Sequence, residues 1–370
     1  MLTIPPFCPN RDCGYHFEED IPQEKRHSWY HKDGSYTTQL HGTIRRFVCT
    51  NCGKRFSSQT FSLDYGVKCH ISYHRLFAHI TTCSGIRALA RILNVSEGVI
   101  INRISRLARQ SIAIHALLRE TFSLHEEIVA DGFESFTCSQ YHPNNIHLAV
   151  GKDSQYLYGA DYAHLRRKGR MTKQQIKRRE ELEREWRAPK GDVIRSFLRL
   201  LRQIDEYREE GEDIPVVLYT DEKREYRRCT EGESWIGHLQ IPSTEPRTLR
   251  NELFSVNYYD REIRKDQSNH TRETVEYSRD VNNAMDRMWI YSVYHNYVKP
   301  YRIDRSEERT HGECAGVAVD ELKKLWKRFF TQRFFVSRLR LSESEWYSWY
   351  RCYATPMKLT ATVFPQYADA

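Results

Sequence analysis

The chain has 370 residues, and its 57 lysines and arginines against 49 aspartates and glutamates give a formal net charge of +8. Its 39% of hydrophobic residues can form packed cores, which excludes a wholly disordered chain. No run of about 18 apolar residues occurs, and the N-terminus lacks the basic and apolar regions of a secretory leader, so we expect a cytoplasmic protein. The length predicts two or three domains, and the basic balance fits a polyanionic partner.

Four cysteines near the N-terminus have the spacing of zinc ligands. Four residues separate Cys8 from Cys13, and two separate Cys49 from Cys52. Thiolates favour zinc, and two such pairs can surround one tetrahedral Zn²⁺ ion in a structural site. One of the neighbouring histidines could replace a cysteine, and four unrelated buried thiols are the other interpretation.

Strand-like runs at 36–38 and 43–48 lie between the two cysteine pairs. They predict a zinc ribbon, which we place at residues 1–65. Basic side chains flank the second pair and suit a phosphate backbone. These side chains are Arg45, Arg46, Lys54 and Arg55.

Residues 85–109 show two short helical patterns, which are broken at Asn94 and Val95. Ser96 stands where an N-cap belongs, so a second helix is predicted to start there. We predict a DNA-binding helix-turn-helix over residues 66–120, with an ordinary helical hairpin as the alternative. The outward positions of the second helix, which could reach phosphates or base edges in a major groove, are Asn102, Arg103, Arg106 and Arg109.

The central part of the chain predicts strand, strand, strand, helix and strand. The segments are 128–130, 146–153, 155–165, 193–207 and 216–219. Asp131 ends the first strand and Asp221 ends the fourth. This order matches ribonuclease-H-like folds, so the expected class is α/β multidomain, with a mixed sheet and flanking helices. Two such aspartates can share a pair of magnesium ions, although aspartate is also common in turns at strand ends.

A third acidic group is expected from a later helix. We prefer Asp260, because a carboxylate is a better partner for two cations than the amide of Asn257. Asn257 and Asp260 are three residues apart and share a helix face. Glu262 is a further alternative. Arg264 and Lys265 are suited to hold DNA ends, or else form a solvated helix face.

Several motifs follow one another along the chain. They are CPNRDC, RRFVCTNCGKRFS, ARILNVS, DGFESF, LYTDEKREY and NYYDREIRKD. Their order resembles that of bacterial insertion-sequence DDE transposases. In that family a zinc module and a helix-turn-helix bind the transposon ends, and a ribonuclease-H-like domain cuts and joins DNA. The resemblance covers residues 8–300 and makes Asp131 and Asp221 the first two metal-binding carboxylates.

The resemblance also implies cofactors and partners. Mg²⁺ or Mn²⁺ would be held by Asp131, Asp221 and Asp260, and the partners would be double-stranded DNA at the transposon ends and at the target. The third ligand of the family is a glutamate. In this sequence Asn257 stands at the position of that glutamate, and Asp260 follows one helical turn later. An assembly of at least two chains and a location at the nucleoid are expected. We predict a DNA transposase; a DNA-binding regulator with an inactive nuclease-like domain and a nuclease without strand transfer are the alternatives.

The remaining boundaries follow from composition. Residues 121–305 form the predicted catalytic domain, and 306–370 form a C-terminal helical extension. A basic insertion at 164–190 interrupts the catalytic domain, and its first part has eight basic residues and no acidic one. Such charge favours DNA binding, although the acidic stretch that follows could pair with it. The residues of the insertion expected to contact DNA are Arg166, Arg167 and Lys168.

Overall fold

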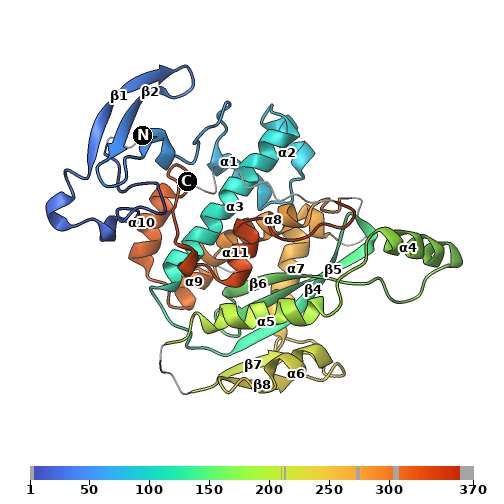
Figure 1. Cartoon of the computed structure of the whole chain (residues 1–370). Coiled ribbons are helices and arrows are strands. Elements are labelled where there is room, and N and C mark those ends of the chain that lie inside the picture. Colours follow the sequence, from blue (N-terminus) through green and yellow to red (C-terminus); the bar gives the residue numbers. More distant parts are fainter. Residues whose placement is uncertain (1–3, 210, 212–213, 272–275, 303–307, 359–370) are drawn as a thin grey trace. The chain divides into compact units, whose positions relative to one another are not determined.

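Figure 1 shows the protein as a computed structural model. The residues that the structure describes are 4–209, 211, 214–271, 276–302 and 308–358. The chain divides into two compact units. Of the described residues, unit 1 contains 4–74 and 325–335, and unit 2 contains the others. The domain boundaries predicted at residues 65, 120 and 305 remain predictions.

Unit 1 is built on an antiparallel sheet of three strands. They are β1 (Tyr30–Thr38), β2 (Gly42–Cys49) and β3 (Arg55–Ser57), with β2 in the middle, and the short 3₁₀ helices are η1 (Glu18–Asp20), η2 (Gln23–Lys25) and η3 (Ser58–Phe61). The two strands predicted between the cysteine pairs are confirmed, and β1 is longer than predicted. Buried rings form the core: Trp29 stacks on Phe56, with ring centroids 5.9 Å apart, and Phe47 lies beside them.

Unit 2 contains a mixed sheet of five strands in the order β6-β5-β4-β7-β8. The strands are β4 (Ile128–Thr137), β5 (Ser139–Gly151), β6 (Leu157–His164), β7 (Val216–Thr220) and β8 (Ile236–Gln240). β4, β5 and β6 are antiparallel neighbours, whereas β7 runs parallel to β4 and β8 parallel to β7. The predicted strands are therefore present in the predicted order.

The predicted end of the first strand at Asp131 is wrong. β4 continues to Thr137, because β5 supplies backbone partners along its whole length, from the pair of Ile128 with Gly151 to the pair of Thr137 with Ser139. Pairing with a long neighbour keeps the polar residues after Asp131 extended. Asp131 consequently lies inside a strand.

The helices of the described residues are mostly short. They are α1 (Tyr73–Ile80), α2 (Ile86–Ile92), α3 (Glu97–Arg119), α4 (Lys173–Glu185), α5 (Asp192–Asp205), α6 (Arg224–Thr230), α7 (Phe254–Asp266), α8 (Val281–Tyr297), α9 (His311–Cys314), α10 (Val319–Phe329) and α11 (Glu343–Trp349), with 3₁₀ helices η4 (Ser268–His270) and η5 (Arg338–Arg340). The helix predicted at 193–207 is confirmed as α5. Within the described residues, no helix combines the length and the apolar character needed to cross a membrane.

Helices α5 and α7 cover opposite faces of the five-stranded sheet (Figure 1). On one face, Nδ1 of His147 in β5 lies 2.8 Å from Oγ of Ser196 in α5. On the other, the Arg264 guanidinium of α7 lies 4.4 Å from the ring centroid of Phe133 in β4. Phe133 is paired with Ile146, so these two side chains lie on the same face of the sheet. His147 follows Ile146, and successive side chains of a strand point to opposite faces, so His147 and Phe133 mark the two faces.

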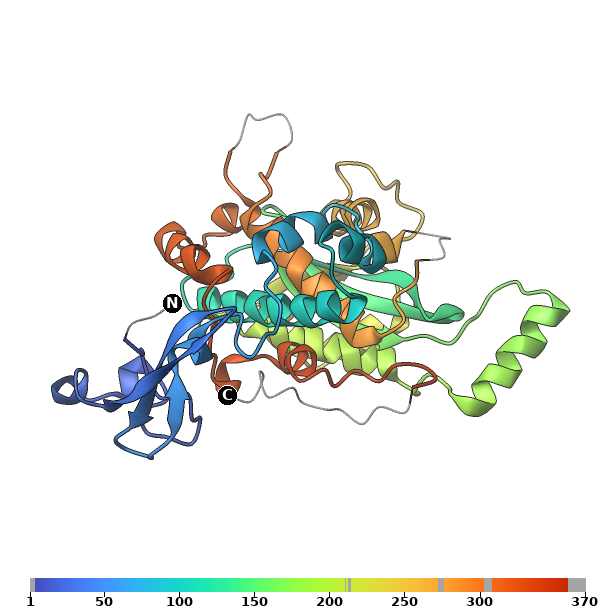
Figure 2. The ribbon, with the colours of Figure 1, turned by 90° about the horizontal axis from the view of Figure 1, so that it is seen from above.

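α3 is the longest helix of unit 2 and crosses α8, as Figure 2 shows. Its N-cap is Ser96, whose Oγ accepts a hydrogen bond of 3.4 Å from the backbone N–H of Val99. Asn94 has a φ of +51° in the turn between α2 and α3. Both features confirm the predicted break and helix start.

The predicted outward position of three arginines on α3 is wrong. Arg103, Arg106 and Arg109 are buried, because most of α3 lies inside unit 2. Arg109 donates hydrogen bonds of 2.9 Å to the carbonyl oxygen of Trp349 and to Oγ of Ser105. The exposed Asn102 accepts from Arg103 at 2.6 Å and from Arg106 at 3.0 Å. These guanidinium groups therefore serve internal contacts.

The C-terminal region adds α11 to the interior of unit 2. Arg119 at the end of α3 donates two hydrogen bonds of 3.0 Å to the buried carboxylate of Glu345. Trp349 and Tyr353 of this segment are buried. Of the predicted extension 306–370, residues 306–307 and 359–370 lie outside the described residues.

Candidate functional site

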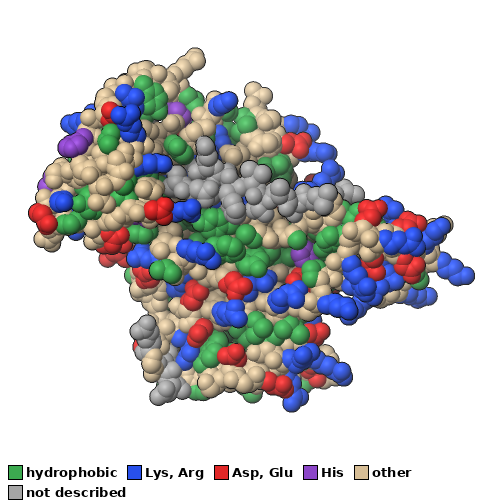
Figure 3. All heavy atoms as spheres, viewed as in Figure 1, with side chains coloured by type: hydrophobic (Ala, Val, Ile, Leu, Met, Phe, Trp, Pro, Cys, Tyr) green, Lys and Arg blue, Asp and Glu red, His purple; other side chains and the backbone are tan. Residues whose placement is uncertain are grey.

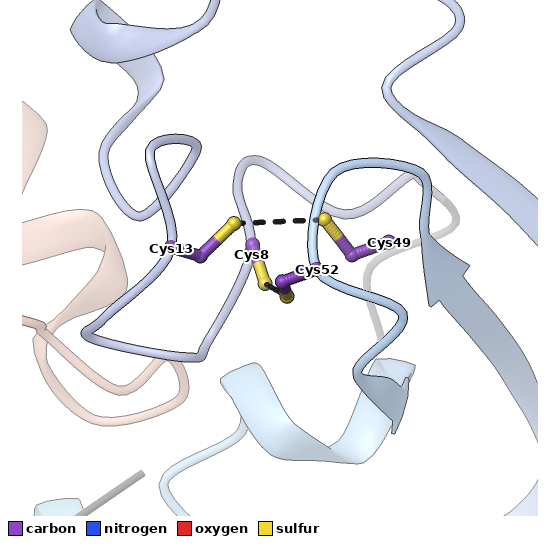
Figure 4. A group of neighbouring side chains, drawn as sticks. All are labelled: Cys8, Cys13, Cys49 and Cys52. Carbon is purple, nitrogen blue, oxygen red and sulfur yellow. Dashed lines mark hydrogen bonds between the residues drawn. The ribbon is translucent and has the colours of Figure 1, made fainter.

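Unit 1 brings the four cysteines of the sequence motif together. Their Sγ atoms all lie within 4.8 Å of one another. The Sγ atoms of Cys8 and Cys52 are 3.6 Å apart, and those of Cys13 and Cys49 are 3.7 Å apart (Figure 4). The four cysteines could bind zinc, whose preferred ligands they supply in the number of a closed tetrahedral site.

The backbone around the cysteines supplies N–H donors to the sulfur atoms. The backbone N–H of Tyr15 and the side-chain amide of Asn51 each lie 3.4 Å from Sγ of Cys13. Burial raises the pKa of Cys52, but hydrogen bonds from Asn10 and from the backbone of Lys54 outweigh it and lower the pKa to about 7. Burial raises the pKa of Cys8 and of Cys49, so the four thiols do not share this shift, and a bound metal ion would have to displace their protons.

The histidine alternative finds no support among the described residues, since the group of candidate ligands contains only cysteines. Nδ1 of His16, the nearest histidine in sequence to the first pair, lies 2.9 Å from the carbonyl oxygen of Cys8. The basic residues predicted to contact DNA beside the second pair are all exposed. These are Arg45, Arg46, Lys54 and Arg55.

In unit 2, Asp131 and Asp221 come from neighbouring parallel strands. The register pairs Ile128 with Leu218 and Val129 with Tyr219, so that Asp131 in β4 is level with Asp221, directly after β7. Burial raises the pKa of Asp131 to about 6, and the charge of Asp221 adds to the rise. The two carboxylates are thus within electrostatic reach of each other.

Asp260 of α7 is coupled to Asp131 by charge, although among the described residues only the four cysteines lie close enough together to share one ion. Burial raises the pKa of Asp260 well above the usual value, and the charge of Asp131 adds to that effect, while Arg264 opposes it. Oδ1 of Asp260 is buried and has no hydrogen-bond partner. Of the alternatives, Asn257 donates its side-chain amide to the carbonyl oxygen of Leu253 at 2.8 Å.

Glu262, the remaining alternative, is turned into ion pairs. Its carboxylate contacts the ammonium group of Lys299 and lies 3.3 Å from that of Lys265. Both contacts lower the pKa of Glu262 against the opposing effect of burial. Asp260, and not Glu262, is therefore the acidic group of α7 whose charge is coupled to Asp131.

Several residues beside the carboxylates were not singled out from the sequence. Positive charges on Lys223 and Arg247 oppose the rise in the pKa of Asp131. Burial, and then the charges of Asp131 and Asp221, raise the pKa of Tyr226. Lys223 lies two residues after Asp221, and this closeness in sequence could have identified it as a residue of the site. Nothing in the sequence connects Tyr226 or Arg247 to Asp131.

Three arginines of the basic insertion, Arg166, Arg178 and Arg179, form ion pairs with its acidic residues. Arg166 donates hydrogen bonds of 2.7 and 2.8 Å to Glu183, and Arg178 lies 3.0 Å from Glu181. Figure 3 shows lysines and arginines gathered with acidic side chains over α4. The predicted pairing of the insertion with the following acidic stretch is confirmed.

The other residues predicted to contact DNA differ in their surroundings. The guanidinium of Arg167 lies 4.9 Å from the ring centroid of Tyr141, and Lys168 is exposed. Arg264 stacks on Phe133 and donates a hydrogen bond of 3.1 Å to the carbonyl oxygen of Glu134. Their contact with DNA remains a prediction, as does that of Lys265.

Comparison with known proteins identifies no family. No family model matches the sequence, and no curated protein matches it. Solved structures that match include a chain of the cryo-EM structure of the simian T-cell lymphotropic virus intasome in complex with PP2A regulatory subunit B56 gamma. The TM-score is 0.29 at 10% identity, and the match covers 54% of this chain and 56% of that chain. The protein thus spans just over half the length of that chain, and the likeness is too loose to identify the fold.

Proposed function

We propose that the protein is a metal-dependent DNA transposase, which cleaves DNA at transposon ends and joins the freed 3′-hydroxyl to target DNA. One observation carries the proposal: carboxylates from β4, from the end of β7 and from α7 are electrostatically coupled around Asp131. Three carboxylates drawn from distant parts of the chain are the ligand set for divalent cations in phosphoryl transfer.

The sheet supports a ribonuclease-H-like catalytic domain. Three antiparallel strands are followed by two strands parallel to the first, in the order third, second, first, fourth, fifth. This is the strand order of ribonuclease-H-like folds. Asp131 is on the first strand, which is central in the sheet, and Asp221 follows the fourth, beside it.

The residues fit Mg²⁺ or Mn²⁺ on the chemistry of their donors. Asp131, Asp221 and Asp260 offer oxygen ligands, which these cations prefer, and Oδ1 of Asp260 is a buried acceptor without a partner. The bound ions would lower the pKa of a nucleophilic water and neutralise charge on the phosphate. Lys223 and Arg247 place positive charge beside the carboxylates, where it would help to hold the phosphodiester.

DNA binding would be shared by two basic regions. The cysteine cluster would hold structural zinc, and the exposed basic residues beside it would contact DNA. The insertion around α4 would bind a phosphate backbone when its arginines leave their acidic partners and pair with phosphates instead. Both contacts are electrostatic, so affinity would fall steeply with salt concentration. Because transposition pairs two DNA ends, we expect an assembly of at least two chains.

The test is cleavage of a plasmid that carries the coding sequence with its native flanking DNA, in Mg²⁺ and in Mn²⁺. Asp131→Asn and Asp221→Asn should each lose cleavage by more than about a hundredfold while DNA binding is retained. Glu134→Gln is the matched control, because Glu134 is an exposed carboxylate on the same strand as Asp131. Unchanged cleavage by Asp131→Asn or Asp221→Asn would reject the assignment.

A DNA-binding regulator with an inactive nuclease-like domain is the second candidate. One observation favours it: among the described residues, only the cysteines form a group of three or more potential ligands close enough to share one ion. Specific binding to the flanking DNA without cutting in any divalent cation would support the regulator. Magnesium-dependent nicking that requires Asp131 would exclude it.

A further inference from the structure

A cavity of about 440 Å³ lies in unit 2 between the α2–α3 region and the segment from η4 to α8. Its volume falls in the usual range of small-molecule sites. Ile86, Ile101 and Tyr277 provide apolar and aromatic wall. The polar wall holds four arginines and two carboxylates, Glu97 and Glu276, and Glu97 lies 3.4 Å from the guanidinium of Arg87. These arginines are Arg87, Arg91, Arg279 and Arg287. The combination of flat apolar surface and positive charge suits a nucleotide.

Arg287 is the buried cation of this cavity. It is 4% exposed, and its guanidinium donates hydrogen bonds to neutral acceptors: the carbonyl oxygen of Ser84 at 3.1 Å, Oγ of Ser268 at 3.3 Å and Oε1 of Gln267 at 3.4 Å. Among the described residues its hydrogen-bond partners are all neutral, although the charge of Glu276, which also lines the cavity, acts on it. Burial lowers the pKa of Arg287 to about 10, against the opposing charges of Cys83 and Glu276. A buried guanidinium with no bound carboxylate is costly, and an anionic ligand would offset that cost.

Asn269 provides an independent indication of a ligand. It lines the same cavity and is 7% exposed. Its side-chain amide donates a hydrogen bond of 2.9 Å to Oγ of Ser278, whereas its Oδ1 is buried and has no partner. An unsatisfied buried acceptor costs about 1–3 kcal/mol, so a ligand with an N–H donor would be favoured here.

The cavity is connected to the carboxylate site through β4. Asp131, Phe133 and Ser135 alternate along one face of the strand. His270, which follows Asn269, packs edge-on against Phe133, and its Nδ1 lies 3.0 Å from Oγ of Ser135. Ser135 is four positions after Asp131 on the strand, which is roughly 13 Å. His270 of η4 thus links Ser135 of β4 to its neighbour Asn269 in the cavity wall.

We propose that this cavity holds one unstacked nucleotide, with its base against Ile101 and Tyr277, an N–H group of the base donating to Oδ1 of Asn269, and a phosphate at Arg287. Extruding a base costs a few kcal/mol, which stacking on apolar side chains and pairing of both buried polar groups can offset. The identification of that nucleotide as part of a DNA strand rests on the function proposed above. The nucleotide-binding chemistry of the cavity does not.

The first experiment measures binding to the full zinc-loaded chain without magnesium. The probes are 2-aminopurine deoxyribonucleoside monophosphate and a 12-nucleotide single strand with one central 2-aminopurine, whose fluorescence reports its environment. We expect saturable binding of both probes. Arg287→Gln and Asn269→Leu should weaken it at least tenfold, and Arg261→Gln, an exposed arginine on α7 outside the cavity wall, should not.

A steric variant guards against loss of folding at Arg287. Ile101→Trp would fill the cavity from its wall while leaving Arg287 and Asn269 intact, and its thermal unfolding would be measured beside the wild type. A folded Ile101→Trp protein that binds the monophosphate as well as wild type would overturn the proposal. So would the absence of saturable binding of either probe, or competition by inorganic phosphate as strong as by the nucleotide, since the cavity would then be an anion site.

Two comparisons complete the experiment. The first distinguishes a nucleotide in a DNA strand from a free nucleotide, and the second distinguishes failure of the cavity proposal from failure of the transposase proposal. If the ligand belongs to a DNA strand, the cavity variants weaken binding of the oligonucleotide; if only the monophosphate responds, the ligand is a free nucleotide and the strand assignment is wrong. Asp131→Asn should bind the monophosphate probe like wild type, because Asp131 does not line the cavity. Failure of cleavage with intact probe binding would therefore count against the transposase and not against the cavity.

Discussion

Asp260 on α7 lies within electrostatic reach of Asp131 on β4, and the charge of Asp131 raises the pKa of Asp260 further than burial alone does. The two carboxylates belong to segments that are more than a hundred residues apart in sequence. Two buried like charges oppose each other, so their closeness is favourable only when positive charge is added. Lys223 and Arg264 supply part of it, and a divalent cation would supply more.

The identity of the third carboxylate can be tested directly. Asp260→Asn should reduce metal-dependent cleavage by more than about a hundredfold, because the amide keeps the shape of the side chain but removes the charge that would bind a cation. Glu262→Gln should leave the rate of cleavage at saturating magnesium within about threefold, since Glu262 is held by lysines. The reverse pattern in a single-turnover cleavage assay would make Glu262 the ligand.

Asp131 should make the stability of the magnesium-free protein depend on pH. Its pKa is raised from 3.8 to about 6 in the fold, so the folded chain binds the proton more tightly than the unfolded chain. Asp131 therefore makes no unfavourable contribution to the free energy of unfolding below pH 3.8, where it is protonated in both states. Its destabilising effect on the fold grows as the pH rises, and is complete above a pH of about 6. At roughly 1.4 kcal/mol per pKa unit, the loss is about 3 kcal/mol at neutral pH.

Asp131→Asn removes that loss. At pH 7.5 the variant should unfold several degrees above the wild type in a thermal scan without magnesium, and the difference should shrink towards pH 4. Glu134→Gln, at an exposed position of the same strand, should melt like the wild type at both pH values. A melting temperature of Asp131→Asn that equals the wild type at pH 7.5 would show that Asp131 is not strained by burial and charge.

Zinc removal should unfold unit 1 selectively. Three of the four cysteines are part of the same buried cluster as Trp29 and Phe47, so loss of the ion would remove both ligand bonds and packing. We expect one zinc per chain by atomic absorption, and none in Cys49→Ser. Chelation should abolish the hydrogen-exchange protection of β1 and β2 and spare that of β4 and β5.

The control for zinc is Cys83→Ser, which changes an exposed cysteine of unit 2. It should keep the zinc content and the protection of β1. Retention of zinc by Cys49→Ser, or unchanged exchange in unit 1 after chelation, would contradict the assignment.

The basic insertion should bind DNA more tightly when its acidic partner is removed. Glu183 accepts two hydrogen bonds from Arg166, and replacing it by glutamine leaves that guanidinium available for a phosphate. Because ion pairs near the surface contribute little to stability, and the Arg166 side chain of this pair is 42% exposed, Glu183→Gln should melt close to the wild type. Its affinity for DNA should rise about threefold to tenfold at low salt, with a steeper salt dependence.

The matched control is Glu321→Gln, which breaks an exposed ion pair with Lys324 on α10. It should leave DNA affinity unchanged in the same fluorescence anisotropy titration. Equal affinities of Glu183→Gln and wild type across the salt series would mean that the insertion does not contact DNA.

The order of the strands and the place of the first two carboxylates were accessible from the sequence for a physical reason. The apolar runs before Asp131 and Asp221 are long enough only for buried strands. The parallel pairing of β4 with β7 places the residues after these runs level with each other, although Asp131 lies inside β4 and only Asp221 follows its strand. The length of β4 was not accessible, because its polar half is kept extended by pairing with β5. Which residue of α7 lies near Asp131 depends on how the helix packs against the sheet, and the helical repeat of the sequence does not specify that packing.

The arginines of α3 show where sequence reasoning fails. The sequence pattern of α3 separates an apolar helix face from a face that carries the arginines. The sequence predicted a short helix here, and the basic face of a short helix is usually solvated. Here the acceptor for Arg109 is the carbonyl oxygen of Trp349, 240 positions further along the chain. No local pattern reveals such a partner, so the burial of the basic face could not be predicted.

Substitution of Arg109 should therefore lower stability and not DNA affinity. Arg109→Met removes hydrogen bonds to the carbonyl oxygen of Trp349 and to Ser105 from a buried position, and should destabilise unit 2 by roughly 2–4 kcal/mol in denaturant titrations. Its DNA affinity, measured below the unfolding transition, should match the wild type. Arg46→Gln is the opposite control, because the exposed Arg46 of β2 should affect DNA affinity alone. A stable Arg109→Met protein with weakened DNA binding would show that the arginines of α3 become accessible to DNA after all.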